Sequence, residues 1–419
     1  MKGSLKTWLI LIGVVIIIAG AGAYLTIYRT GRGRPERRAY RLADIAGKVA
    51  SSQAVLAYLR APGRETLQNA LQTCLSTAER MPEDVFNGFL TAFCYHETGD
   101  AAGEARTLSK YRPEQKNMYK FCFYERRDEL ADALYFLPAY LCSKLRESPR
   151  ARDSFPPRAK CPSFGGPIVK KDYQRGNNMI ERFICPKCDG MIELSEKNFL
   201  GNIILHRVKK ANLLVSILPS IATDLEDRRR FKGEKRNTVK NLIAAMDLRE
   251  GMRLADIGCG VGQFTFPFAE KVGPKGKVYA EDIDAGMIKL IKYCADKGGL
   301  RNIAPVLGTP DDIKLPPGAL DMATLIHIYR SIVIGLDEKG LQYLEPFFDT
   351  FLAGIYKALK SDGVLVLVDH FDPRFEISVE TTAEALKKRN FRLVADKSDS
   401  RGRTMILFFK KTQTERNRL

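Results

Sequence analysis

The C-terminal half of this 419-residue chain predicts an α/β fold, with an open, mostly parallel sheet and helices on both faces. Three observations predict it. An apolar run over 252–257 leads into three glycines at alternate positions, and a segment with helical potential follows. A second β-prone run, 277–280, ends in acidic residues. From residue 252 onward, further strand-like runs alternate with long helical patterns, as βαβ crossovers require.

The strand-like runs are short and rich in apolar residues. The last two are joined by a short loop, Asp396–Arg403, which fits only an antiparallel hairpin. The expected strands are Met252–Ile257, Lys277–Asp282, Ile303–Leu307, Leu320–Ile326, Gly363–Asp369, Phe391–Ala395 and Thr404–Lys410.

The glycines Gly258, Gly260 and Gly262 indicate a ligand site at the first strand end. Glycine lets the backbone adopt positive φ and approach a ligand closely, and the N–H groups of the following helix face that ligand. Asp282 lies about 20 residues further on, where a carboxylate partners a ribose diol. The spacing is G-x-G-x-G, which differs from the dinucleotide pattern G-x-G-x-x-G.

Three segments together resemble a known family. They are Asp256–Gly262, the run Phe264–Asp282 and the run Gly308–Asp321. These residues resemble class I S-adenosylmethionine-dependent methyltransferases, with the nearest likeness to the quinone-biosynthesis-type branch. The resemblance covers roughly 237–411. It implies a Rossmann-like seven-stranded sheet with one antiparallel strand, and S-adenosylmethionine as the cofactor.

The resemblance also implies roles for single residues. Asp256 would brace the glycine turn or meet the cofactor's amino group through water. Asp282 would accept both ribose hydroxyls, and Ile283 would lie against adenine. Asp311 or Asp312 would accept the adenine amino group, or else be a solvated loop residue or a helix cap. The three glycines Gly258, Gly260 and Gly262 would pass close to the methionine portion.

The end of the fourth strand departs from the related branch. His327 stands where that branch often has an acidic residue, and Tyr329 precedes Arg330 where it has a histidine. His327 and Tyr329 are the candidate catalytic residues. Histidine is a suitable base near neutral pH. Because methyl transfer often depends on alignment alone, His327 could instead form a wall of the cofactor pocket.

The N-terminus predicts a membrane anchor over residues 1–28. Thr7 to Tyr28 carries no charge and is long enough to cross a bilayer as a transmembrane helix. The basic linker 29–39 and Arg41 then place the C-terminal domain in the cytoplasm by the positive-inside rule. A cleaved signal peptide ending near Ala21 or Ala23 is the alternative.

The net charge of +18 favours an acidic partner, either a membrane surface or nucleic acid, or reflects a solvated basic surface. Nucleic acid ranks last, since the Asn/Asp-Pro-Pro-aromatic motif of amino-methylating enzymes is missing. The nine cysteines, an odd number, fit a reducing compartment.

Residues 40–147 predict a helical domain, because apolar residues recur at helical spacing. One stretch, 87–105, faintly resembles a tetratricopeptide hairpin, and this domain could recruit protein partners. His96 within it is expected to be an ordinary surface or core residue.

Residues 201–234 are expected to form an amphipathic helix and a linker. The helix, 203–218, would end at Pro219 and lie on the neighbouring domain or on the membrane face. The methyltransferase domain spans 235–412.

Residues 148–200 are rich in cysteine and proline. Cys185 and Cys188 have the spacing of a zinc knuckle, and Cys161 is a third candidate ligand. Phe164 stands where the partner of Cys161 is expected, and His206 is the only nearby fourth ligand by type. The cysteines therefore hold zinc or form a lost site.

The favoured function is a membrane-anchored methyltransferase that modifies a small molecule or lipid, with a lipophilic acceptor such as a quinone precursor preferred. The alternative is a catalytically degenerate methyltransferase-fold scaffold that recruits proteins through the helical domain.

Overall fold

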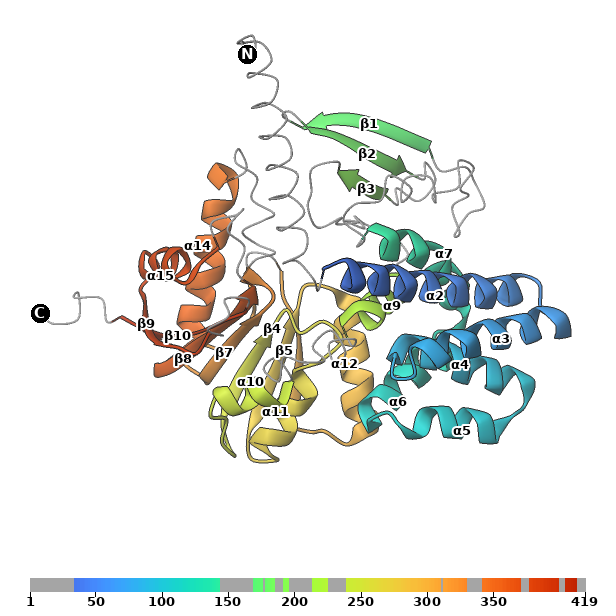
Figure 1. Cartoon of the computed structure of the whole chain (residues 1–419). Helices are drawn as coiled ribbons and strands as arrows, with labels where there is room; N and C mark the ends of the chain where they lie inside the picture. The colour runs from blue at the N-terminus through green and yellow to red at the C-terminus, as the bar shows by residue number, and fades with distance from the viewer. Residues whose placement is uncertain are drawn as a thin grey trace, which may run out of the picture.

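The computed structural model describes residues 34–143, 169–175, 178–184, 191–195, 213–224, 239–309, 312–329, 341–370, 377–398 and 404–412 (Figure 1). Among these residues, no helix combines the length and apolar character needed to cross a bilayer. The predicted anchor Thr7 to Tyr28 lies outside them, as do Cys161, Cys185, Cys188, His206 and Asp311.

The C-terminal domain is built on a seven-stranded sheet in the order β6-β5-β4-β7-β8-β10-β9. Only β10 runs antiparallel to its neighbours, β8 and β9. The prediction of a Rossmann-like sheet with one antiparallel strand is therefore confirmed. The strands are β4 (Arg253–Ile257), β5 (Lys277–Asp282), β6 (Ile303–Leu307), β7 (Leu320–Ile326), β8 (Leu359–His370), β9 (Phe391–Asp396) and β10 (Thr404–Lys411).

Helices cover both faces of this sheet, because side chains alternate along each strand. Leu254 of β4 joins one apolar core, and its neighbour Ala255 joins the other. The first core includes α10 (Val239–Ala245), α11 (Thr265–Val272) and α12 (Ala285–Gly298); the second includes α14 (Leu341–Ala358) and α15 (Val379–Lys387). The strand order reverses between β4 and β7, which is where open α/β sheets bind ligands.

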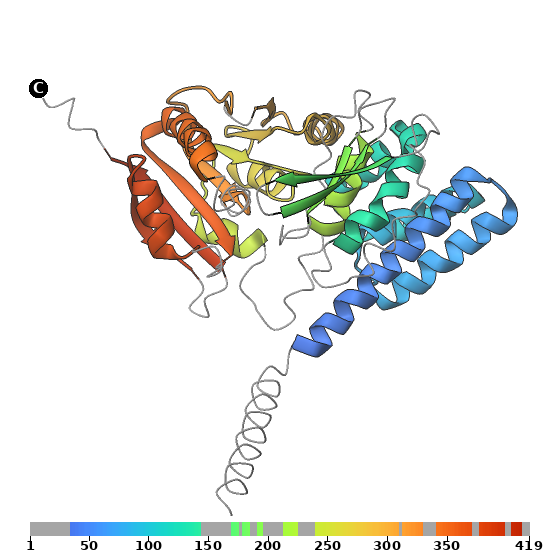
Figure 2. The same cartoon turned by 90° about the horizontal axis from the view of Figure 1, so that it is seen from above.

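A bundle of helices lies to one side of the sheet in both views (Figures 1 and 2). Asp84 caps α4 by accepting a hydrogen bond from the Asn87 N–H, and Gly99 ends that helix in the left-handed conformation, with φ 77°. The bundle comprises α2 (Arg34–Arg60), α3 (Arg64–Arg80), α4 (Val85–Thr98), α5 (Ala101–Ser109), α6 (Pro113–Lys120), the π-helix η1 (Phe121–Glu125) and α7 (Arg127–Ser143).

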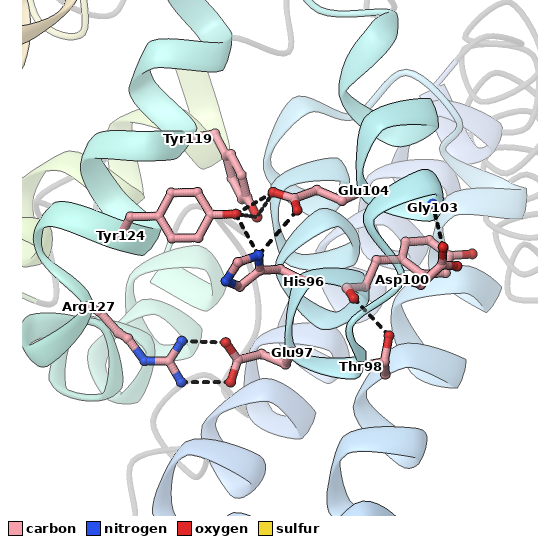
Figure 3. Close-up of polar contacts among 10 residues, drawn as sticks. His96, Glu97, Thr98, Asp100, Gly103, Glu104, Tyr119, Tyr124 and Arg127 are labelled. Atoms are coloured by element: carbon pink, nitrogen blue, oxygen red, sulfur yellow. Dashed lines mark hydrogen bonds and ion pairs between the residues drawn. The ribbon is translucent and has the colours of Figure 1, made fainter.

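The π-helix brings two tyrosines to one carboxylate (Figure 3). Tyr119 and Tyr124 are five residues apart and would diverge by about 140° on a regular α-helix. Here both hydroxyls donate to Glu104 Oε1, and His96 Nδ1 lies 3.2 Å from Glu104 Oε2. Burial, followed by the Glu104 hydrogen bond, raises the pKa of Tyr124 to about 12. This cluster joins α4, α5, α6 and η1. His96 is an exposed residue at the surface of α4.

A separate antiparallel sheet follows the bundle in the chain, which the sequence analysis did not predict. Its strands are β1 (Val169–Arg175), β2 (Asn178–Ile184) and β3 (Met191–Ser195), in the order β1-β2-β3. Cys185 and Cys188 fall in the connection between β2 and β3, outside the described residues.

Helix α9 (Leu214–Asp224) corrects the expectation of a helix that ends at Pro219. The helix contains Pro219 and runs on to Asp224. Leu214, Ile217, Leu218 and Ile221 are fully buried in the core shared with α7 and α12. Burial of this apolar stripe offsets the hydrogen bond that proline removes from a helix interior.

The bundle and the sheet domain share one apolar core. The ring of Phe121 on η1 packs on Tyr293 of α12, with the centroids 5.1 Å apart. The Tyr293 hydroxyl donates to Glu125 Oε1 at 3.3 Å. Helix α12 therefore contacts the sheet on one side and the bundle on the other (Figure 1).

Candidate active site

The turn between β4 and α11 requires its glycines. Gly258, Gly260 and Gly262 have φ of 70°, 51° and 82°, a region that other residues rarely adopt. A Cβ on Gly258 would lie 2.3 Å from Ile328 Cδ1, and one on Gly262 would lie 2.5 Å from Phe266. A Cβ on Gly260 would meet nothing within 4 Å. The middle of the turn thus borders open space while its ends pack tightly.

Asp282 joins this turn to the end of β5. Its Oδ2 accepts a hydrogen bond from the Gly260 N–H at 2.9 Å, and its Oδ1 accepts from the Asp284 N–H at 2.9 Å. Burial raises the pKa of this carboxyl, and the two N–H donors oppose that rise. A carboxylate offers about four acceptor positions, so Asp282 can accept further hydroxyl donors here.

Apolar side chains are exposed beside Asp282. Ile283 is 60% exposed and Leu307, at the end of the neighbouring β6, is 46% exposed. Leu307 is paired with Asp282 across the sheet, so both exposed apolar side chains are neighbours of this acid. Asp312 is exposed too, and its Oδ1 accepts from the Lys314 N–H at 2.9 Å, which closes a local turn. The other adenine candidate, Asp311, lies outside the described residues.

Asp256 is buried beneath the glycine turn. Its Oδ2 accepts from Thr265 Oγ1, the first residue of α11, at 2.6 Å. Burial raises the pKa of Asp256 to about 6, against the opposing effect of the Thr265 hydrogen bond. Of the two roles that the sequence suggested, this contact favours bracing the turn.

Glu281 is a buried acid that the sequence analysis missed. Its backbone oxygen accepts from the Cys259 N–H at 2.9 Å, and the Gly258 N–H has a lowering effect on the pKa of its carboxyl. Burial, and then the charge of Asp282, raise the pKa of Glu281 to about 8. A Cβ on Gly308 would lie 1.9 Å from Glu281 Oε1, so glycine at 308 leaves room for this carboxyl. The Glu281 backbone and the Asp282 side chain thus bind successive N–H groups of the glycine turn, those of Cys259 and Gly260.

His327 directly follows β7 in a left-handed conformation, next to Asp369, a second acid that the sequence analysis missed. Its φ is 60°, and its N–H donates to the Val368 carbonyl at 2.8 Å. His327 Nδ1 lies 4.0 Å from Oδ1 of Asp369, which is buried at the end of β8. The next residue, Ile328, packs on Gly258. Left-handed non-glycine residues concentrate at functional sites, and His327 therefore stays the candidate base.

Tyr329, the other catalytic candidate, lies in the second core. It is buried, and its ring packs on Phe348 of α14 with the centroids 5.9 Å apart. Burial raises the pKa of its phenol. These contacts favour a packing role for Tyr329 over contact with reacting atoms.

The candidate zinc ligands Cys161, Cys185 and Cys188, which hold zinc or form a lost site, lie outside the described residues. Within the part of the chain that the structure describes, no group of three or more His, Cys, Asp or Glu side chains could hold a metal ion.

Comparison with known proteins finds a matching family model and several relatives. Residues 248–410 match the family model described as "Methyltransferase domain". The demethylmenaquinone methyltransferase of Geobacillus stearothermophilus is 25% identical over 134 residues, which are 32% of this chain and 52% of that protein. The ubiquinone/menaquinone biosynthesis C-methyltransferase UbiE of Shewanella sp. (strain W3-18-1) is 26% identical over 186 residues, 44% of this chain and 69% of that protein. This chain thus spans about half the length of the first relative.

Among solved structures, a SAM-dependent methyltransferase from Aquifex aeolicus is similar, with a TM-score of 0.38 and 21% identity over 45% of this chain and 96% of that one. Residues 248–410 therefore form a methyltransferase domain, similar in sequence to S-adenosylmethionine-dependent methyltransferases. The two relatives named above are quinone-pathway methyltransferases, so the likeness is to that type.

Proposed function

We propose that this protein transfers a methyl group from S-adenosylmethionine to a lipophilic small molecule. The proposal rests on the Asp282 carboxylate, which accepts hydrogen bonds from the N–H groups of Gly260 and Asp284 and lies next to the exposed Ile283. These residues fit the cofactor: Asp282 would accept the ribose hydroxyls, Ile283 would contact adenine, and the glycine turn would leave room for the amino-acid portion. When bound, S-adenosylmethionine supplies an electrophilic methyl group on a positively charged sulfur.

Asp282→Asn is expected to weaken S-adenosylmethionine binding by about tenfold or more. The amide keeps the shape of the side chain but loses the charge-assisted hydrogen bonds, each worth roughly 1.5–3 kcal/mol. Isothermal titration calorimetry on the full-length protein measures the effect. Asp296→Asn, an exposed change on α12, should bind like wild type. If wild type binds NADH and not S-adenosylmethionine, the proposed function is wrong.

His327 is proposed to accept the acceptor's proton. A proton taken up at Nε2 would give an imidazolium, which the buried Asp369 carboxylate stabilises through Nδ1. Asp369 is then a positioning residue. In an acceptor assay, Asp369→Asn should lower kcat by about tenfold or more and shift the acidic limb of the pH–rate profile to a lower pKa, with S-adenosylmethionine affinity unchanged. The Asp362→Asn control, an exposed change in the same domain, should leave both unchanged. An unchanged pH profile in Asp369→Asn would exclude this role.

The preference for a lipophilic acceptor rests on two supports. One is the expected anchor Thr7 to Tyr28, which would keep the domain at the cytoplasmic face of a membrane. The other is the naming of two relatives as quinone-pathway methyltransferases. Lipid and quinone profiling of a deletion strain tests the acceptor, and a C-terminal reporter that is active only after export should stay silent.

A structural zinc ion on Cys161, Cys185 and Cys188 also belongs to the proposal. It rests on the two-residue spacing between Cys185 and Cys188 alone. Elemental analysis of the purified protein decides it, because a Cys185→Ser/Cys188→Ser variant should lose the metal.

A further inference from the structure

The first turn of α9 lies directly against the first turn of α12, beside Asp282. Ser216 Oγ lies 3.2 Å from Asp284 Oδ1 and 3.1 Å from the Leu213 carbonyl oxygen, and its one proton can be donated to either acceptor. A Cβ on Gly286 would lie 2.9 Å from Ser216 Oγ and 3.3 Å from the Leu213 carbonyl oxygen. The two helices therefore approach closely only because residue 286 is glycine.

Asp284 relays this contact to Asp282. Its Oδ1 also accepts from the N–H groups of Gly286 at 2.6 Å and Met287 at 3.2 Å, which caps α12. Its own N–H donates to Asp282 Oδ1 at 2.9 Å. A continuous path of hydrogen bonds thus runs from Ser216 through Asp284 to Asp282.

Helix α9 is fixed to the helical bundle at both of its ends. Near its start, the Leu214 N–H donates to Glu129 Oε2 of α7 at 3.3 Å. Near its end, Lys48 Nζ of α2 donates to the Ala222 carbonyl at 2.6 Å. The bundle therefore helps to set the position of Ser216 against the methyltransferase domain.

We propose that Ser216 is a positioning residue through which the helical bundle holds Asp282 ready for the cofactor ribose. The inference rests on the proposed function, since it assumes that Asp282 binds S-adenosylmethionine. By holding the Asp284 turn, Ser216 keeps the Asp282 carboxylate in one orientation before the cofactor arrives. Preorganisation of this kind raises affinity, because less ordering remains to be done on binding.

The test is titration calorimetry with S-adenosylmethionine on the detergent-solubilised full-length protein. Ser216→Ala should raise the Kd by about two- to tenfold, as expected for one lost hydrogen bond. Ser216→Thr keeps the hydroxyl and should restore most of the affinity. Ser220→Ala, one turn further along α9, is the matched control and should bind like wild type. The urea midpoint of unfolding without cofactor should be the same for both alanine variants, which separates positioning from stability.

The outcomes distinguish this inference from the proposed function. If Ser216→Ala binds within about twofold of wild type while Asp282→Asn loses affinity, the inference is overturned and the proposed function stands. If Ser216→Thr binds as weakly as Ser216→Ala, the hydroxyl contact is not the cause and the inference fails as well. If wild type does not bind S-adenosylmethionine, both are overturned.

Discussion

Lys48→Met is expected to lower the free energy of unfolding by about 3–5 kcal/mol. Lys48 Nζ lies 3.1 Å from Asp84 Oδ2, and both side chains are buried. The ammonium also donates to the Ala222 carbonyl, so one cation joins α2, the start of α4 and the end of α9. Methionine fills similar space but leaves the Asp84 carboxylate buried without its ion pair. Urea unfolding of the full-length protein measures the loss.

Two further variants sharpen this prediction. Lys120→Met, an exposed change on α6, should stay within about 0.5 kcal/mol of wild type. Lys48→Met/Asp84→Asn should recover part of the loss, because it removes the buried charge that the single change leaves behind. A single variant as stable as wild type would show that the ion pair contributes little.

Glu281→Gln is expected to flatten the dependence of stability on pH. The folded-state pKa of Glu281 is raised to about 8, so the folded protein holds a proton that the unfolded chain releases near the ordinary value of 4.5. The free energy of unfolding therefore falls as pH rises between these two values, by up to about 1.4 kcal/mol per pH unit from this group. Glutamine does not titrate, and this contribution disappears.

The expected result is equal stability of wild type and Glu281→Gln near pH 4, and a more stable variant near pH 8. The slope should not vanish, because Asp256, with a pKa of about 6, acts in the same direction. Glu270→Gln, an exposed change on α11, should follow wild type. Parallel curves for wild type and Glu281→Gln, from urea unfolding at a series of pH values, would mean that Glu281 is charged in the folded state.

The sheet could be predicted from the sequence because its signals are local. Apolar runs bounded by glycine, proline and charge predicted strands β5, β6 and β7 with the bounds that the structure shows, whereas β8 begins earlier, at Leu359, and ends one residue later, at His370. The positions of Gly260 and Asp282 followed from the same local pattern, since consecutive strand ends of a parallel sheet meet at one edge.

The missed features depend on contacts between distant parts of the chain. Asp369 approaches His327 only because β7 and β8 pair, and α9 passes Pro219 because two domains bury it. Glu281 lies within a strand, and the local sequence of that strand does not reveal that Gly308 leaves space for the Glu281 carboxyl. Tyr329 lies two residues after the candidate base His327, yet its side chain packs in the second core.

The core that α12 shares with the bundle makes the two parts one cooperative unit. Calorimetry should record a single unfolding transition for them, because neither part can melt without exposing the apolar surface of the other. The same feature restricts how such a chain can evolve or be engineered. Without the bundle, Tyr293, which packs on Phe121, and its apolar neighbours on α12 would be exposed to solvent and would have to be replaced by polar residues. The methyltransferase domain could therefore not be exchanged as an independent module.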